Sequence, residues 1–381
     1  MRSVPNDRPA TPVHRLAYVD GLRALAALWV AVHHAIETSE PTAALAIPVV
    51  GPVLASLFFG QFPVMVFLML SGFCLYYPYV RKRPSRPEFT TGYRAYLVRR
   101  AKRIAPPYLW AGAFCLAMAA IPALQVGRWG KVVGPIDTGT VVSHLLFFHN
   151  LVPRYASKID YPMWSIGLEW QLYLLFPLLM WAFNRVGGVV TMLATLAVAA
   201  AIRGTYHRIP EPMSSVLRDG PFSYLEIFAA GMLVATLIVR RVTVAPRWLL
   251  WAAVVVGLGL VRFGSGNGLV HDLATSAAAF SILLLAAEAG TGASRTLSTP
   301  WLVSLGVFSY SLYLVHAPLL HLGWLALSGL HLSSDAIFGV LVVIGMPAIV
   351  LISYGFHCLF ERPFMRVAPA APASTARAVA E

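Results

Sequence analysis

Apolar segments of membrane-spanning length follow one another along this chain, and they restrict it to one class of fold. A bilayer core is about 30 Å thick, so a helix needs roughly 20 mostly apolar residues to cross it. Only 12% of the residues are charged and 58% are hydrophobic, whereas soluble domains carry about 25% charged residues. We therefore predict an all-α fold, a polytopic integral membrane helical bundle of about ten transmembrane helices. The candidate spans are residues 18–37, 53–79, 105–125, 163–183, 189–203, 221–239, 248–262, 271–288, 301–325 and 336–358.

Basic residues between the spans predict the orientation of the bundle. Residues 81–103 hold nine Lys and Arg residues against one acid, Glu88. The positive-inside rule places this segment in the cytoplasm. Since two spans precede it and about ten cross in total, we predict cytoplasmic N- and C-termini. We expect a multi-pass protein of the inner (plasma) membrane, whose net charge of +13 serves orientation and contact with lipid head groups rather than nucleic acid.

The chain shows no sign of a soluble domain. We predict a cytoplasmic tail at residues 1–15, a membrane domain at 16–366 and a disordered, Ala- and Pro-rich tail at 367–381. Residues 141–152 are too short to cross the bilayer, so we expect a re-entrant or interfacial piece there. The cysteines lie in apolar stretches without metal-ligand spacing, and we expect neither a disulfide nor a metal site.

Two ionisable residues, Arg23 and His34, lie inside the first apolar segment. Eleven helical steps turn through about 1100°, so both side chains face the same way, about 16 Å apart along the axis. His33 falls about 80° off that face. Such residues are expensive inside a membrane, which favours a polar track from the cytoplasmic side to an acid–base group. The alternative is an arginine that reaches the interface and a histidine that fills a helix contact.

Two stripes of polar side chains occur at helical spacing inside later spans. They are Ser165, Glu169 and Tyr173, and Ser309, Tyr313 and His316. A carboxylate such as Glu169 in a transmembrane helix must find a partner, become protonated or line water. Direct chemistry and hydrogen bonding between helices both fit these stripes, because small polar groups often hold transmembrane helices together.

A basic run leads into the third span and includes Arg99, Arg100 and Arg103. Arg100 and Arg103, three positions apart, share a helix face and could grip phosphate through forked, charge-assisted hydrogen bonds. The ordinary explanation of the run is an anchor that contacts lipid head groups on the cytoplasmic side.

Six motifs together resemble the membrane acyltransferase-3 family, and they occur in the family's order over nearly the whole chain. Arg23 and His34 are similar to its opening Arg-x10-His signature, and Ser71 lies in its second-span element. The motifs are YVDGLRALA at 18–26 with His34, FLMLSGF at 67–73, RRAKRIAPP at 99–107, WSIGLEWQLY at 164–173, SYSLYLVH at 309–316 and ERP at 361–363.

The resemblance implies an O-acyltransferase. Members of the family move acyl groups from acyl-CoA, or a similar cytoplasmic donor, to hydroxyls of carbohydrates, glycolipids, peptidoglycan or secondary metabolites. We therefore expect acyl-CoA, and acetyl-CoA in particular, as the donor substrate, with no bound cofactor. Larger relatives append a soluble esterase-like domain, which these 381 residues lack, and this weakens the case for peptidoglycan as the acceptor.

The resemblance also implies roles for the singled-out residues. Arg100 and Arg103, with Arg99, would hold the CoA phosphates, and Arg23 would steer the thioester towards His34. A buried imidazole stays neutral and can take a proton from an acceptor hydroxyl, so His34 suits the role of base. Glu169, if it reaches the imidazole, would fix its tautomer.

Several roles stay open at this stage. Tyr313, Ser71 or an arginine could supply oxyanion donors, and Ser165, Tyr173 and His316 could support the site. His34 could act as general base or carry the acyl group itself. Two other classes remain as alternatives: a proton-coupled transporter or flippase of a glycan precursor, because intramembrane Arg, Glu and His also build proton relays, and a non-catalytic scaffold.

Overall fold

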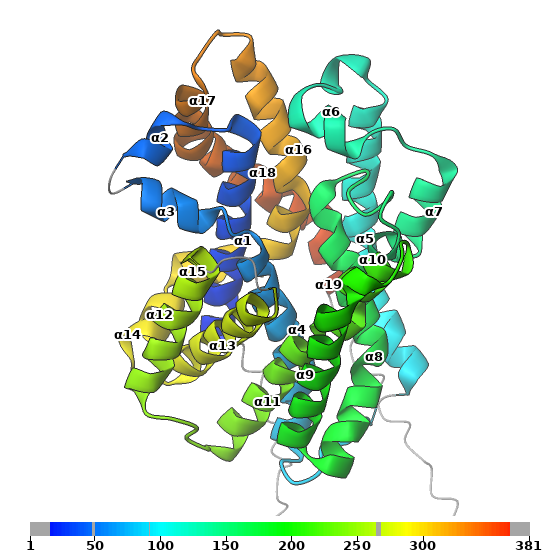
Figure 1. Ribbon diagram of the computed structural model, residues 1–381, viewed down its shortest axis with the longest axis vertical. Coiled ribbons are helices and arrows are strands. Elements are labelled where there is room, and N and C mark those ends of the chain that lie inside the picture. Colours follow the sequence, from blue (N-terminus) through cyan, green and yellow to red (C-terminus); the bar gives the residue numbers. More distant parts are fainter. Residues whose placement is uncertain (1–15, 48–49, 91, 264–267, 366–381) are drawn as a thin grey trace, which may run out of the picture.

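The computed structural model describes residues 16–365, apart from 48–49, 91 and 264–267. Its secondary structure is helical, with no strand among the described residues, and this confirms the predicted all-α class. The predicted tails at 1–15 and 367–381 lie outside the described residues. Figure 1 shows the helices gathered into one bundle, with short helices around one of its ends.

The longer helices form the body of the bundle and the shorter elements connect them. The longer helices are α1 (Ala17–Ser39), α4 (Gln61–Lys82), α5 (Tyr93–Ala119), α8 (Trp164–Val186), α9 (Gly188–Thr205), α11 (Leu225–Arg240), α12 (Arg247–Phe263), α13 (Gly268–Ala287), α16 (Ser309–Ser328) and α18 (Met346–Phe356). The short α-helices are α2 (Ala43–Ala46), α3 (Val50–Leu57), α6 (Gly127–Val133), α7 (Thr138–Leu145), α10 (Met213–Asp219), α14 (Gly292–Leu297), α15 (Pro300–Val307), α17 (Ser334–Val340) and α19 (Arg362–Met365). The 3₁₀ turns are η1 (Pro122–Leu124), η2 (His149–Leu151), η3 (Tyr161–Met163), η4 (Tyr206–Arg208) and η5 (Pro221–Tyr224), and the π turns are η6 (Leu341–Gly345) and η7 (His357–Glu361).

Eight helical stretches of the described chain are long and apolar enough to cross a membrane. They are Ala17–Ser39, Gln61–Lys82, Tyr161–Val186, Gly188–Arg208, Met213–Arg240, Val270–Ala287, Ser309–Ser328 and Ser334–Met365. The other two predicted spans correspond to α12, whose apolar part is shorter, and to α5, whose first half carries the basic run. The structure therefore bears out a polytopic bundle, while the count of ten crossings stays a prediction.

The structure corrects the boundaries of three predicted spans. The predicted span 53–79 is divided between α3 and α4 near Gly60, where an added Cβ would lie 2.2 Å from the His33 ring. The predicted span 301–325 is divided at Phe308 between α15 and α16. The third helix, α5, begins at Tyr93 rather than at 105, because its basic residues continue the same helix beyond the apolar segment.

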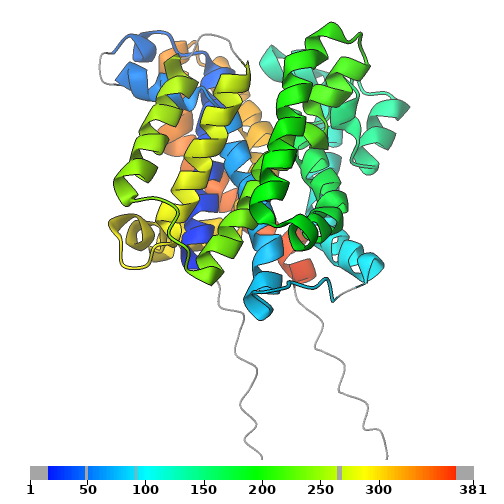
Figure 2. The same cartoon turned by 60° about the horizontal axis from the view of Figure 1, so that its bottom comes forward.

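The two ends of the bundle differ in their elements. α1 begins, α4 ends, α5 begins and α19 ends at one end, which we call the basic end because it carries Arg81–Arg103 (Figure 2). The short helices α2, α3, α6, α7, α10 and α17 lie away from the basic end, and α7 includes the first part of the segment that was expected to be re-entrant (Figures 1 and 2).

Glycines allow the helices that carry the polar motifs to approach closely. A Cβ on Gly231 of α11 would lie 2.0 Å from the Met69 carbonyl oxygen of α4, and one on Gly72 would lie 2.1 Å from that of Phe228. A Cβ on Gly21 of α1 would similarly meet a backbone oxygen at 1.9 Å. Small residues at such crossings strengthen packing between membrane helices. Gly72, next to Ser71, and Gly21, two residues before Arg23, thus allow the close packing of the helices that carry these side chains.

We expect Gly231→Ala to destabilise the bundle. The new methyl group must push α11 and α4 apart, at a cost of about 1–3 kcal/mol for an overpacked contact. The matched control is Gly112→Ala in α5, where nothing lies within 4 Å of an added Cβ and the better helix former is neutral or stabilising. Thermal unfolding in detergent should show a lower Tm for Gly231→Ala only. Equal Tm values for the two variants would contradict the close crossing.

Candidate active site

Two pockets in the bundle meet at shared walls. The arginine pocket, named for Arg23, Arg100 and Arg103, has a volume of about 110 Å³. The histidine pocket, named for His33 and His34, is larger, at about 490 Å³. Val64 and Tyr313 line both pockets. A group that passed from one pocket to the other would therefore cross between these two side chains.

Acidic and basic side chains face one another in the arginine pocket. Arg23 Nη1 lies 3.9 Å from Asp20 Oδ1, one turn earlier on α1. Glu169 Oε1 accepts hydrogen bonds from Ser71 of α4 and from Tyr173 of its own helix. A carboxylate inside a membrane bundle needs a polar partner. These two hydrogen bonds supply it and hold Glu169 in the wall of the arginine pocket.

The same pocket contains a second held carboxylate and two arginines that form no ion pair. Glu361 Oε2 accepts hydrogen bonds from Ser311 Oγ at 2.6 Å and from His357 Nδ1 at 2.8 Å. In the described part of the chain, no salt bridge involves Arg100 or Arg103. Both line the pocket near the basic end, so their guanidinium groups are available to an anion there.

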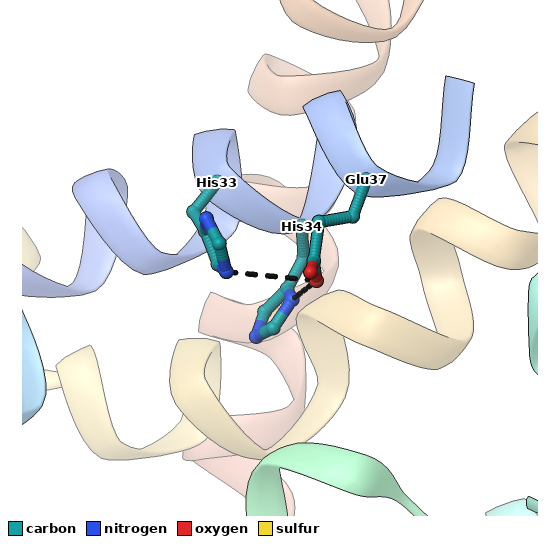
Figure 3. Close-up of side chains that lie close together, drawn as sticks. All are labelled: His33, His34 and Glu37. Carbon is teal, nitrogen blue, oxygen red and sulfur yellow. Dashed lines mark hydrogen bonds and ion pairs between the residues drawn. The ribbon is translucent and has the colours of Figure 1, made fainter. Parts of the chain in front are cut away.

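A carboxylate orients the imidazole of His34 in the histidine pocket. His34 Nδ1 lies 2.9 Å from Glu37 Oε2, one turn later on α1 (Figure 3). His33 Nε2 lies 3.5 Å from the same oxygen. With Nδ1–H donating to the carboxylate, Nε2 of His34 keeps its lone pair and can accept a proton. Glu37 Oε1 is in turn bound by Arg128 Nη2 of α6 at 2.8 Å.

Aromatic rings enclose His34 on two further sides. The His316 ring of α16 stacks on it with centroids 5.2 Å apart, and the Tyr161 ring meets it edge-on at 4.8 Å. His316 Nδ1 donates to the Tyr313 carbonyl oxygen at 2.7 Å, which fixes that ring. The Tyr313 hydroxyl lies 2.6 Å from Ser165 Oγ and 3.1 Å from the Pro162 carbonyl oxygen. Tyr313 is thereby held as a fixed wall between the pockets.

His33, His34 and Glu37 also have donor atoms of the kind that bind a divalent metal. These atoms all lie within 4.8 Å of one another, and imidazole with carboxylate suits several transition metals. Arg128, however, binds the same carboxylate and balances its charge. A dication beside that guanidinium would face electrostatic repulsion. We therefore interpret the cluster as a hydrogen-bonded acid–base group.

The structure distributes the predicted site residues between the two pockets. Those that line the arginine pocket are Arg23, Ser71, Arg100, Arg103, Ser165, Glu169, Tyr173 and Tyr313. Arg99 is exposed and is not among the lining residues, and His316 packs against His34. Arg23 and His34 therefore belong to different pockets, although both lie on α1.

Two expectations about His34 differ from the geometry. Glu169, considered as the partner of the imidazole, lies in the arginine pocket, and Glu37 holds Nδ1 instead. His33, expected to face elsewhere, lines the histidine pocket too, because both rings turn towards the one carboxylate. Glu37 could have been found from its spacing of three residues after His34. Arg128 gives no such signal, because it comes from a distant segment.

The comparisons with known proteins agree with this architecture. The chain matches the family model of the acyltransferase-3 domain, described as an acyltransferase domain, over residues 16–358. Among curated proteins and among solved structures, no match was found. The matched region covers most of the chain and contains both His34 and the basic run. Together with the membrane-length helices, it shows that the chain belongs to the acyltransferase-3 family and is a multi-pass membrane acyltransferase.

Proposed function

We propose that this protein is an O-acyltransferase that takes an acyl group from acyl-CoA at the arginine pocket. The group passes to a hydroxyl of an acceptor bound in the histidine pocket. Acetyl is the acyl group we expect, and the acceptor is a carbohydrate, glycolipid or secondary metabolite. The observation that carries the proposal is the junction of the two pockets at Val64 and Tyr313. On one side lie Arg100 and Arg103, which form no salt bridge among the described residues, and on the other lies the carboxylate-bound imidazole of His34.

The charges at the basic end support a CoA donor. CoA carries several phosphate groups, and guanidinium groups bind phosphate through forked hydrogen bonds. Arg100 and Arg103 form no ion pair in the described chain and are free for this role. The positive-inside rule places the same end in the cytoplasm, where acyl-CoA is found. Arg23, deeper in the pocket, would then meet the thioester end.

His34 supports proton transfer at the junction. Its Nε2 takes the proton of the acceptor hydroxyl while that oxygen attacks the thioester carbonyl carbon. The tetrahedral intermediate collapses, the C–S bond breaks, and the imidazolium returns the proton to the CoA sulfur. Glu37 stabilises the imidazolium through Nδ1–H. In the second route Nε2 attacks the carbonyl carbon itself, the C–S bond breaks and CoA leaves as the thiolate. The acceptor hydroxyl then attacks the acyl carbon, the C–N bond breaks, and the hydroxyl proton passes to the freed imidazole, which returns it to the thiolate.

The packing at the junction of the two pockets favours a short acyl group. Val64 and Tyr313 are both buried, with exposed fractions of 6%, and the Tyr313 ring is held by hydrogen bonds and by Phe67, with ring centroids 5.8 Å apart. Long acyl chains would have to displace these packed side chains. This supports acetyl as the transferred group.

His34→Ala should abolish transfer while the protein still inserts and folds. Loss of a general base costs roughly 10²–10⁴-fold, and loss of a covalent carrier costs more. Cells carrying wild type, His34→Ala or no gene would be extracted, and their glycolipids, surface glycans and secreted metabolites compared by mass spectrometry. His207→Ala, an exposed histidine in η4, is the matched control and should keep the acylated products.

The outcome of this comparison separates the function classes. A mass increment that requires His34 gives the size of the acyl group and identifies its carrier. Acylated products from His34→Ala at wild-type levels, absent without the gene, would contradict the proposed role of this residue while leaving acyl transfer in place.

Arg100→Ala and Arg103→Ala should raise the KM for acyl-CoA more than they lower kcat. Each variant removes charge-assisted hydrogen bonds worth about 1.5–3 kcal/mol, which corresponds to a loss of roughly tenfold or more in the affinity for acyl-CoA. Arg99→Ala is the control, because Arg99 is the exposed neighbour that does not line the pocket. Steady-state kinetics with purified protein and labelled acetyl-CoA would measure both constants. An equal effect of all three substitutions would indicate a general surface anchor instead.

A further inference from the structure

We propose that Arg128 of α6 is a positioning residue for His34 and acts on it through Glu37. In this view the acid–base group of His34 and Glu37 is complete only when α6 packs onto the bundle. The position of α6 therefore affects the catalytic imidazole. The inference rests on the proposed function of His34. It assigns a residue that lies outside all the motifs of the sequence analysis.

Arg128 contacts two of the side chains that surround His34, Glu37 and Tyr161. Its Nη2 lies 2.8 Å from Glu37 Oε1, while Glu37 Oε2 lies 2.9 Å from His34 Nδ1. Its guanidinium also lies over the Tyr161 ring, 5.7 Å from the centroid, and that ring meets the His34 imidazole at 4.8 Å. Arg128 therefore holds the carboxylate that orients the imidazole and one of the rings that enclose it.

The residues on either side of Arg128 fix α6 to α16. Trp129 is 2% exposed, and its ring stacks on His321 with centroids 5.5 Å apart and an interplanar angle of 14°. Gly127 has a φ of +61°, and a Cβ there would lie 2.8 Å from the Trp324 ring. Glycine is thus required at this position, both for the left-handed backbone and for the contact. Figure 1 shows α6 beside α16 at the end of the bundle opposite the basic end.

The charges around His34 give Arg128 an electrostatic role as well. The titratable and charged groups that face the imidazole, from the elements packed against it, are Glu37, His33, His316, Tyr161 and Arg128. Arg218 and Asp219 also line the pocket, but they bind each other. Arg128 is the permanent cation of the group around His34, and it opposes protonation of the imidazole. Without it, the base would be occupied by a proton up to a higher pH.

The test is the pH dependence of kcat/KM in an Arg128 series. Arg128→Gln should lower kcat/KM at neutral pH by about tenfold, since a misplaced catalytic group costs one to two orders of magnitude. The acidic limb of its profile should move to higher pH. Arg128→Lys, which restores the charge, should return the limb towards its wild-type position. Arg154→Gln is the matched control, because Arg154 is an exposed arginine that pairs with Asp137 and does not line the histidine pocket.

A double-mutant cycle tests whether Arg128 acts through Glu37. In a Glu37→Gln background, Arg128→Gln should add little to the loss, because the two residues then no longer form an ion pair. Additive losses, or a wild-type profile for Arg128→Gln, would overturn the inference. Failure of this inference is distinguishable from failure of the proposed function: in the first case His34→Ala is still inactive, and in the second it is active.

Discussion

Polar groups are costly inside a bilayer, and this constraint determines how the bundle holds its functional side chains. Glu37, Glu169 and Glu361 each accept two or more contacts from neighbouring polar groups, so none faces lipid alone. Some of these contacts join segments that are distant in sequence: Arg128 to Glu37, Ser71 to Glu169 and Ser311 to Glu361. The need to satisfy charges inside the membrane thus fixes the carboxylates that line or adjoin the two pockets.

The two pockets separate the tasks of acyl transfer. Arg100 and Arg103, which form no salt bridge within the described part of the chain, suit the charged part of a CoA donor, and the larger histidine pocket suits an acceptor. The buried side chains of Val64 and Tyr313 lie between the two pockets. The acceptor hydroxyl would therefore attack the thioester carbonyl at a place from which water is excluded. In this account Glu37 orients His34, and Arg128 of α6 holds Glu37 in place.

Sequence reasoning predicted the class of fold from local patterns, and it singled out several of the polar residues that line the arginine pocket. Apolar length gave the bundle, and helical spacing brought Ser165, Glu169 and Tyr173 to one region. Periodicity could not reveal that Glu169 and His34 line different pockets, since this depends on where the bundle places α8 and α1. Arg128 was equally out of reach, because its place follows from the docking of Trp129 and not from spacing.

Protection of Cys74 by CoA would test the central claim most directly. This native cysteine lines the arginine pocket, whereas Cys358 does not and serves as an internal reference. Alkylation by N-ethylmaleimide in detergent would be followed by peptide mass spectrometry, with and without CoA. The account predicts that CoA slows the labelling of Cys74 and leaves that of Cys358 unchanged. Equal labelling rates of Cys74 at saturating CoA would contradict a donor site in the arginine pocket.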